Sequence, residues 1–100
     1  MTKYLLVYYG EPTEPKLVEK SMAKWMKWFG DLGEAVVDGG APTQPGKLVS
    51  STGVKGVGAK PVSGYTILQA NSLDAAVSLA KGCPVIAESG HVAVYPMMAM

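Results

Sequence analysis

The segment PVSGYTILQANSLDAAVSLAKGCP (residues 61–84), followed by GHVAVYP (residues 90–96), carries the clearest structural signals in this sequence. Tyr65–Ala70 is a β-branched and aromatic run of strand length, and Val92–Tyr95 is a second one. The residues between them repeat apolar side chains at helical spacing. We therefore expect a strand, a short helix over about residues 72–81, and a closing strand.

The two ends of this helix carry recognised capping residues. Asn71 and Ser72 can both cap the first turn, and with Asn71 as the cap Asp74 falls where a negative charge suits the helix dipole. Gly82 can adopt the left-handed conformation that ends a helix, and Pro84 prevents continuation. The apolar face is narrow, which allows close packing on a sheet, and comprises Leu73, Ala76, Val77 and Ala80.

The front half of the chain supplies a matching unit. Lys3–Tyr9 is apolar at nearly every position, so both faces of this strand are expected to be buried. Pro15 suits the first position of a helix, and Gly30 or Gly33 would end it.

This first helix has one apolar face and one basic face. The apolar stripe comprises Val18, Met22, Trp25, Phe29 and Leu32, with Met26 and Trp28 on its flanks. The remaining circumference carries Lys16, Lys20, Lys24 and Lys27. Such patterning is typical of a solvated helix face, with a partner-binding patch as the alternative.

The middle of the chain contains short strands separated by glycine and proline. Glu34–Val37 and Lys47–Ser51 are expected strands, and a turn after Ser51 returns the chain through Val54–Val57. The resulting order, β-α-β(β)-β-α-β, predicts an α+β fold of ferredoxin-like βαββαβ type with one antiparallel sheet.

Composition indicates one globular domain spanning residues 1–100, with 48% hydrophobic residues. No apolar run approaches the ~20 residues needed to span a membrane, and no signal peptide is evident. The single cysteine fits a reducing compartment, so we expect a cytoplasmic protein. A net charge of +1 without arginine argues against nucleic-acid binding.

Four short motifs along the chain resemble those of a known protein family. These are KYLLVYYG (residues 3–10), WMKWFGDLG (25–33), GYTILQANSLDAA (64–76) and GCP (82–84), and together they resemble the YCII-related proteins over essentially the whole chain. The resemblance implies a dimeric α/β barrel, in which two ferredoxin-like sheets pack face to face. It also implies a cleft between sheet and helices, suited to a small organic acid or lactone. Some members of the family resemble dehalogenating or eliminating enzymes that use a histidine and an aspartate.

The sequence departs from this family pattern at the positions that carry chemistry. Met22 falls where such members carry the histidine. The Asp-Gly-Pro-Phe segment of another branch is absent, because the corresponding stretch is VGAKPVSG, residues 57–64. The fold therefore carries over, whereas the catalytic pair does not, and function has to be argued from a site.

Strand alternation predicts which side chains share a sheet face. If Val92 and Val94 point under the helices, His91 and Tyr95 point to the other face. Tyr65, Ile67 and Gln69 are expected on that same face, and Tyr4, Leu6 and Tyr8 are candidates to join them, with the register of the first strand left open. A mostly apolar surface with a few polar groups is typical of ligand pockets and of dimer interfaces.

Two weak catalytic candidates remain. His91 is the only histidine, and three roles stay open: a strand-end or interface residue, a ligand contact, and a general acid–base. Asp38 precedes two glycines, so it is either a turn-former or a cleft carboxylate. Cys83 is expected to be a packed thiol rather than a nucleophile.

The ligand-cleft candidates are the aromatic and amide side chains that the expected strands and first helix present. Trp25 and Trp28 are expected in the core or an interface, or alternatively as a stacking surface for a ligand. The complete set of cleft candidates is Tyr8, Trp28, Tyr65, Gln69 and Tyr95. One histidine, one cysteine and scattered carboxylates predict neither a metal site nor a cofactor.

Three functions fit these observations. The first is a homodimeric YCII-related-like domain that binds a small molecule, and the second is an enzyme acting on a small organic acid or lactone with His91 or Asp38 replacing the missing pair. The third is a non-catalytic dimerisation or interaction module with the tail Met97–Met100 exposed. Homodimerisation is expected in each, because two helices cover only one face of the sheet. Neither nucleic acid nor a membrane is expected as a partner.

Overall fold

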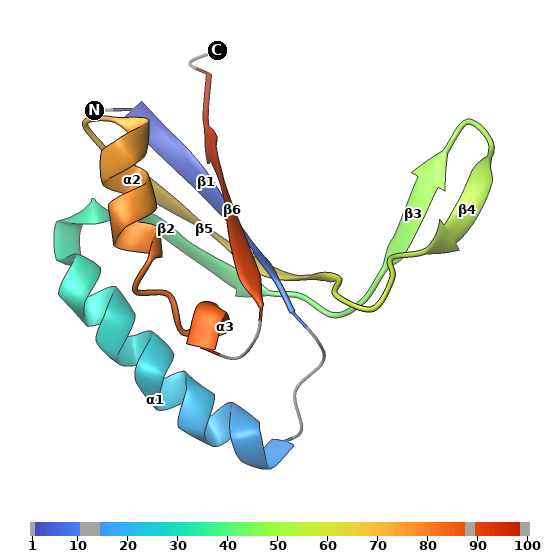
Figure 1. Ribbon diagram of the computed structural model, residues 1–100, viewed down its shortest axis with the longest axis horizontal. Coiled ribbons are helices and arrows are strands. Elements are labelled where there is room, and N and C mark those ends of the chain that lie inside the picture. Colours follow the sequence, from blue (N-terminus) through green and yellow to red (C-terminus); the bar gives the residue numbers. More distant parts are fainter. Residues whose placement is uncertain (1, 11–14, 88–89, 99–100) are drawn as a thin grey trace.

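The computed structural model describes residues 2–10, 15–87 and 90–98, with the backbone only for residues 15–21 (Figure 1). The main sheet consists of β1 (Thr2–Tyr9), β2 (Val36–Pro42), β5 (Val62–Ala70) and β6 (His91–Pro96). The helices are α1 (Pro15–Leu32), α2 (Leu73–Ala80) and the short α3 (Pro84–Ala87), with a 3-10 turn η1 at Gly33–Ala35. A separate pair of strands is formed by β3 (Lys47–Ser50) and β4 (Gly53–Gly56).

The main sheet has the strand order β2-β5-β1-β6, and all of its neighbouring strands are antiparallel. Two βαβ units that interleave in this way form the ferredoxin-like architecture predicted from the sequence. Helices α1 and α2 contribute to one core on one side of the sheet, and the other face carries no helix among the described residues (Figure 1). We refer to that other side as the open face.

The register of β1 assigns its side chains to the two faces. Tyr4, Leu6 and Tyr8 are buried beneath the helices, whereas Leu5 and Val7 are only half-buried. The sequence left the register of this strand open, and the alternative that placed Tyr4, Leu6 and Tyr8 on the open face is therefore wrong. The expectation that both faces of β1 are buried is also not met within one chain, because the helices cover a single face.

Helix α1 begins at Pro15, as predicted, and turns a face centred on Trp28 toward the sheet. Trp28 and Leu32 are buried, but Met22 and Met26 are 57% and 71% exposed. The predicted stripe was therefore centred too far toward the Met22 side of the helix. The side chains of Val18, Lys16 and Lys20 lie outside the described part. Gly33 ends the helix, since its φ of 55° is a conformation that glycine adopts without penalty.

Helix α2 begins as predicted but ends differently. The Ser72 hydroxyl caps it by accepting a hydrogen bond from the Ala75 amide at 3.1 Å, and Asp74 lies in the first turn. Gly82 does not adopt a positive φ. Its amide instead donates to the Leu79 carbonyl in a tightened last turn. Pro84 does not simply stop the chain but starts α3, since proline suits a first helical position.

Strand β2 extends through the glycines that were expected to form a loop. It starts at Val36 and runs to Pro42, with register shifts against β5 on both sides of Asp38. Gly40 has a φ of 72°, and any side chain there would collide with the Tyr65 carbonyl. These bulges are what allow a glycine-rich segment to pair at the edge of the sheet.

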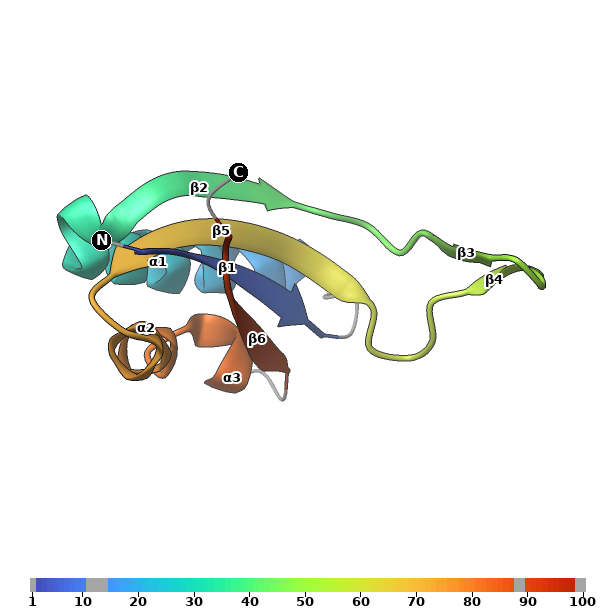
Figure 2. The ribbon, with the colours of Figure 1, turned by 90° about the horizontal axis from the view of Figure 1, so that it is seen from above.

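Strands β3 and β4 form a hairpin, residues 47–56, that projects from the body of the molecule (Figure 2). We call this hairpin the arm. The sequence predicted both of its strands, apart from small differences at their ends. The turn after Ser51, which returns the chain into the second strand, was also predicted. What was not predicted is that the two strands form a sheet separate from the main one, with every residue exposed. Among the described residues, no helix is long and apolar enough to cross a membrane.

Replacing each of the two tryptophans by alanine should show, from the loss in free energy of unfolding, that Trp28 lies in the core and Trp25 at its margin. Trp28 is 7% exposed, so Trp28→Ala should lower the free energy of unfolding by about 3–5 kcal/mol. Trp25 is only half-buried, and Trp25→Ala should cost about 1–2 kcal/mol less than Trp28→Ala. Urea denaturation of both variants checks this order. Equal costs, or a cost of Trp28→Ala below about 1 kcal/mol, would contradict the packing described.

Candidate functional site

A buried pair of hydroxyl groups lies on the helix-covered side of the sheet. The Tyr8 hydroxyl donates to Thr66 Oγ1 at 2.6 Å, and Thr66 Oγ1 donates to the Gly39 carbonyl at 3.1 Å. This chain of hydrogen bonds joins β1, β5 and β2. Thr66 is fully buried, and every buried side-chain nitrogen or oxygen in the described residues has a hydrogen-bond partner.

An aromatic cluster covers the hydroxyl pair. It comprises Tyr8, Trp25, Trp28 and Phe29. The Tyr8 ring meets Trp25 edge-on at 4.7 Å between ring centroids, and the centroids of Trp25 and Trp28 are 5.6 Å apart. Helical spacing explains the grouping, because residues three and four apart in α1 lie on the same face. Trp25 is half-buried and forms the margin of this cluster.

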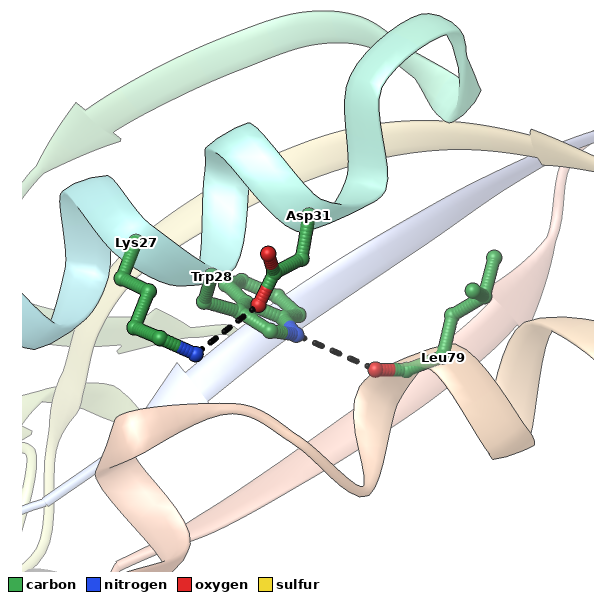
Figure 3. A network of polar contacts seen from close by, with 4 residues as sticks. All are labelled: Lys27, Trp28, Asp31 and Leu79. Carbon is green, nitrogen blue, oxygen red and sulfur yellow. Dashed lines mark hydrogen bonds and ion pairs between the residues drawn. The ribbon is translucent and has the colours of Figure 1, made fainter.

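Trp28 is held in place by the second helix. Its indole Nε1 donates to the Leu79 carbonyl at 3.2 Å, which links α1 to α2 (Figure 3). A side chain on Gly82 would lie 3.2 Å from the Trp28 ring, so the turn after α2 packs closely against the indole. The Lys27–Asp31 ion pair beside it is 82% and 67% exposed, so it contributes little to stability.

The phenol of Tyr8 is a permanent hydrogen-bond donor. Burial raises the pKa of Tyr8 well above its ordinary value of 10.0, an effect that the hydrogen bond to Thr66 opposes and the nearby Cys83 reinforces. Cys83 is itself buried. The group at the centre of the cluster therefore stays protonated at neutral pH, with its one proton donated to Thr66, and it cannot serve as a base.

His91 lies on the open face at an edge of the sheet. It is exposed, pairs with Tyr9 across the β1–β6 ladder, and stacks on the Tyr9 ring at 4.8 Å with planes 13° apart. Its strand, β6, is separated from β2 by both β5 and β1.

Asp38 is on the opposite edge strand and has a local partner. Its carboxylate accepts a hydrogen bond from the Gly40 amide at 2.8 Å, as a turn-forming aspartate does. Because neighbouring strands are about 4.8 Å apart, Asp38 and His91 are separated by more than ~10 Å within one chain. They do not form a catalytic pair there.

The cleft candidates named from the sequence lie on two different faces. Tyr8 and Trp28 meet in the aromatic cluster. Tyr65, Gln69 and Tyr95 lie on the open face, with Tyr65 and Tyr95 37% and 52% exposed. Gln69 uses its amide to donate to the Glu34 carbonyl at 2.9 Å.

Sequence reasoning missed Thr66 and the role of Phe29. Thr66 alternates with Tyr65 and Ile67, so it belongs to the buried face of β5 with Leu68 and Ala70. A polar residue at a buried position of a strand needs a partner, and that signal was available from the alternation alone. The described residues contain no group of three or more histidine, cysteine or acidic side chains that could hold a metal ion.

The buried phenol predicts an alkaline loss of stability. Only the unfolded chain can ionise Tyr8 just above pH 10.0, so the free energy of unfolding should fall there by up to ~1.4 kcal/mol per pH unit until the folded phenol ionises. Tyr8→Phe should remove this contribution, and urea denaturation between pH 9 and 11.5 measures it. The control is Tyr95→Phe, an exposed tyrosine. A Tyr8→Phe variant with the same pH slope as Tyr95→Phe would contradict the assignment.

No curated protein matches this chain. A similar solved structure is 5-chloro-2-hydroxyhydroquinone dehydrochlorinase (TftG) from Burkholderia phenoliruptrix AC1100, in complex with 2,5-dihydroxybenzoquinone. The match has a TM-score of 0.65 at 16% sequence identity and covers 98% of this chain and 95% of that chain. At this identity the likeness concerns the fold.

The sequence itself identifies the family. The model of the YCII-related domain matches residues 2–100 and therefore takes in both βαβ units and the arm between them. This agrees with the resemblance carried by the motifs at residues 3–10, 25–33 and 64–76. The chain belongs to the YCII-related domain family.

Proposed function

We propose that this protein is a homodimeric small-molecule-binding domain that takes its ligand at the margin of the aromatic cluster. The observation that carries the proposal is the Tyr8–Thr66 hydroxyl pair, 2.6 Å apart, with Trp25 and Trp28 packed around it. Ligand sites are commonly apolar with a few fixed polar groups, which is the composition found here.

The chemistry of the cluster favours a flat, oxygen-bearing ligand. The half-buried indole of Trp25 offers a surface for a ring to stack on. The Tyr8 oxygen, whose one proton is donated to Thr66, keeps a lone pair that can accept a hydrogen bond from a ligand hydroxyl. Hydroxylated small acids, lactones and quinones have these features. TftG, which has a similar fold, was solved with 2,5-dihydroxybenzoquinone, a flat ring of this kind.

The open face supports the homodimer. Its central residues are apolar and only half-buried in one chain, and tyrosines lie beside them. They comprise Leu5, Val7, Tyr9, Tyr65, Ile67, Ala93 and Tyr95. Soluble monomers seldom leave a continuous apolar sheet face in water, and a second copy would cover this one with an identical surface.

Catalysis on a small acid or lactone is the second candidate, and the fold of TftG, a dehydrochlorinase, favours it. Within one chain His91 would have to act without Asp38, because the two lie on opposite edges of the sheet. A non-catalytic interaction module is the remaining alternative. The single cysteine leads us to place the protein in the cytoplasm.

The homodimer is tested by light scattering. We expect a dimer at micromolar concentration for the native chain, and monomer for Ile67→Lys, because two symmetry-related charges would be buried near the middle of the interface. The matched control is Met26→Lys, which places the same charge on a 71% exposed position of α1 and should leave the dimer intact. A native chain that is monomeric would contradict the proposal, and circular dichroism shows whether each variant is folded.

Ligand binding is tested by a thermal-shift screen of small carboxylic acids, lactones and 2,5-dihydroxybenzoquinone. A compound present at a hundred times its dissociation constant should stabilise the fold by about 2.7 kcal/mol and raise the melting temperature. Trp25→Ala should reduce or abolish the shift, because it removes the stacking surface. Met26→Ala, at a 71% exposed position of α1 outside the proposed interface, is the control and should retain it.

The same experiment separates the three functions. Consumption of the bound compound, lost in His91→Ala but retained in Tyr95→Ala, would establish an enzyme. Binding without consumption is the result we expect. If no compound of these classes binds at millimolar concentration, the interaction module replaces the ligand-binding proposal.

A further inference from the structure

We propose that the arm of each protomer docks on a second copy of this chain, where Lys47 and Lys55 meet the acidic end of the second copy's sheet. The inference rests on the proposed homodimer and specifies a contact outside the two open faces. It also fixes how the two protomers are oriented.

The arm exposes apolar side chains to solvent, where they do not stabilise an undocked hairpin. Val49 and Val54 are direct partners in the β3–β4 ladder and are 77% and 65% exposed, and Leu48 on the other face is 50% exposed. An isolated two-stranded hairpin is at best marginally stable in water. The paired valines therefore form a surface that gains stability by docking.

The arm also carries charge of one sign. Between Asp38 and Asp74 the sequence contains no acidic residue but has Lys47, Lys55 and Lys60. Lys47 and Lys55 belong to the arm itself, one on each strand, and both are exposed. A partner surface for the arm should therefore be acidic.

Such a surface lies at the far end of the sheet. Strand β2 starts beside Glu34 and ends toward the arm, and β5 starts from the arm and ends beside Asp74. Glu34 lies in η1 and Asp74 in the first turn of α2. Figure 1 shows the arm on one side of the molecule and these two elements on the opposite side. Both Glu34 and Asp74 are exposed. The side-chain amide of Gln69, a residue of the open face, donates a hydrogen bond to the Glu34 carbonyl, so Glu34 lies next to that face.

Other charges at this end leave it acidic. Lys3 lies opposite Gln69 in the β1–β5 ladder and is the basic residue of the open face at this end of the sheet. Asp38, farther along β2, carries a negative charge that offsets the charge of Lys3. Asp31 is already paired with Lys27 at 3.4 Å. Within the described residues Glu34 and Asp74 form no ion pair, and their carboxylates are therefore available to lysines of a second copy.

Symmetry then selects the orientation. If two sheets pack face to face with a two-fold axis perpendicular to the strands, the arm of each copy passes the acidic end of the other. If the axis runs along the strands, the two basic arms lie side by side and repel each other. The charge distribution favours the first arrangement.

Charge reversal tests the contact, with dimer dissociation constants measured by analytical ultracentrifugation. Lys47→Glu/Lys55→Glu should weaken the dimer about tenfold or more, because each dimer would contain the repulsive contact twice. Glu34→Lys/Asp74→Lys should weaken it similarly. A chain with all four substitutions should regain most of the native affinity, because the charges are again complementary. Circular dichroism confirms that each variant is folded.

The matched control is Lys24→Glu/Lys81→Glu, which reverses two exposed lysines on the helix side and should leave the affinity unchanged. Native affinity in the arm variant, or no recovery in the fourfold variant, would overturn the docking while leaving the dimer itself intact. A monomeric native chain would overturn both.

Val49→Thr/Val54→Thr should also weaken the dimer. Unchanged affinity in that variant would contradict the role of the two valines in the contact.

Discussion

The pairing of β1 with β5 is the constraint on which the rest of this structure depends. Leu6 lies opposite Thr66, and Leu5 lies opposite Ile67. Since side chains alternate along a strand, this register sends one set of residues to the helices and the other to the open face. The hydrogen bond from Tyr8 to Thr66 fits only this register, because a slip of one residue would turn the phenol away from the helices. The buried hydroxyl pair thus specifies the sheet as well as occupying its core.

Local signals were enough to predict most of the elements. The helix caps depend on a few neighbouring residues, and the sequence narrowed each to two candidates. Of these, Ser72 rather than Asn71 caps α2, with Asp74 in its first turn, and Gly33 rather than Gly30 ends α1. The register of β1 was not predictable in this way, because Lys3–Tyr9 is apolar on both faces and periodicity carries no information about which face is inward. Gly82 was assigned a left-handed cap, but it does not adopt a positive φ, and close packing against Trp28 explains the glycine there instead.

The candidate site was less predictable than the fold, since it depends on contacts between distant segments. Tyr8 and Trp28 were named individually, but their grouping with Trp25 requires α1 to cross β1 at a particular rotation. His91 and Asp38 were alternative catalytic candidates, His91 because it is the only histidine and Asp38 because it precedes two glycines. The strand order places them on opposite edges, and strand order follows from the crossover connections rather than from the composition of either strand.

Because β1 contributes alternate residues to both faces, the proposed ligand site and the proposed dimer interface share one structural element. Tyr8 belongs to the aromatic cluster, whereas its neighbours Val7 and Tyr9 belong to the open face. A displacement of β1 on dimerisation would therefore move the phenol relative to Trp25, and a ligand held by Tyr8 would in turn favour one position of the strand. Any difference in affinity between monomer and dimer has to appear reciprocally as an effect of the ligand on dimerisation. The two proposed functions, placed on opposite sides of a single strand, would thereby be coupled without a dedicated regulatory site.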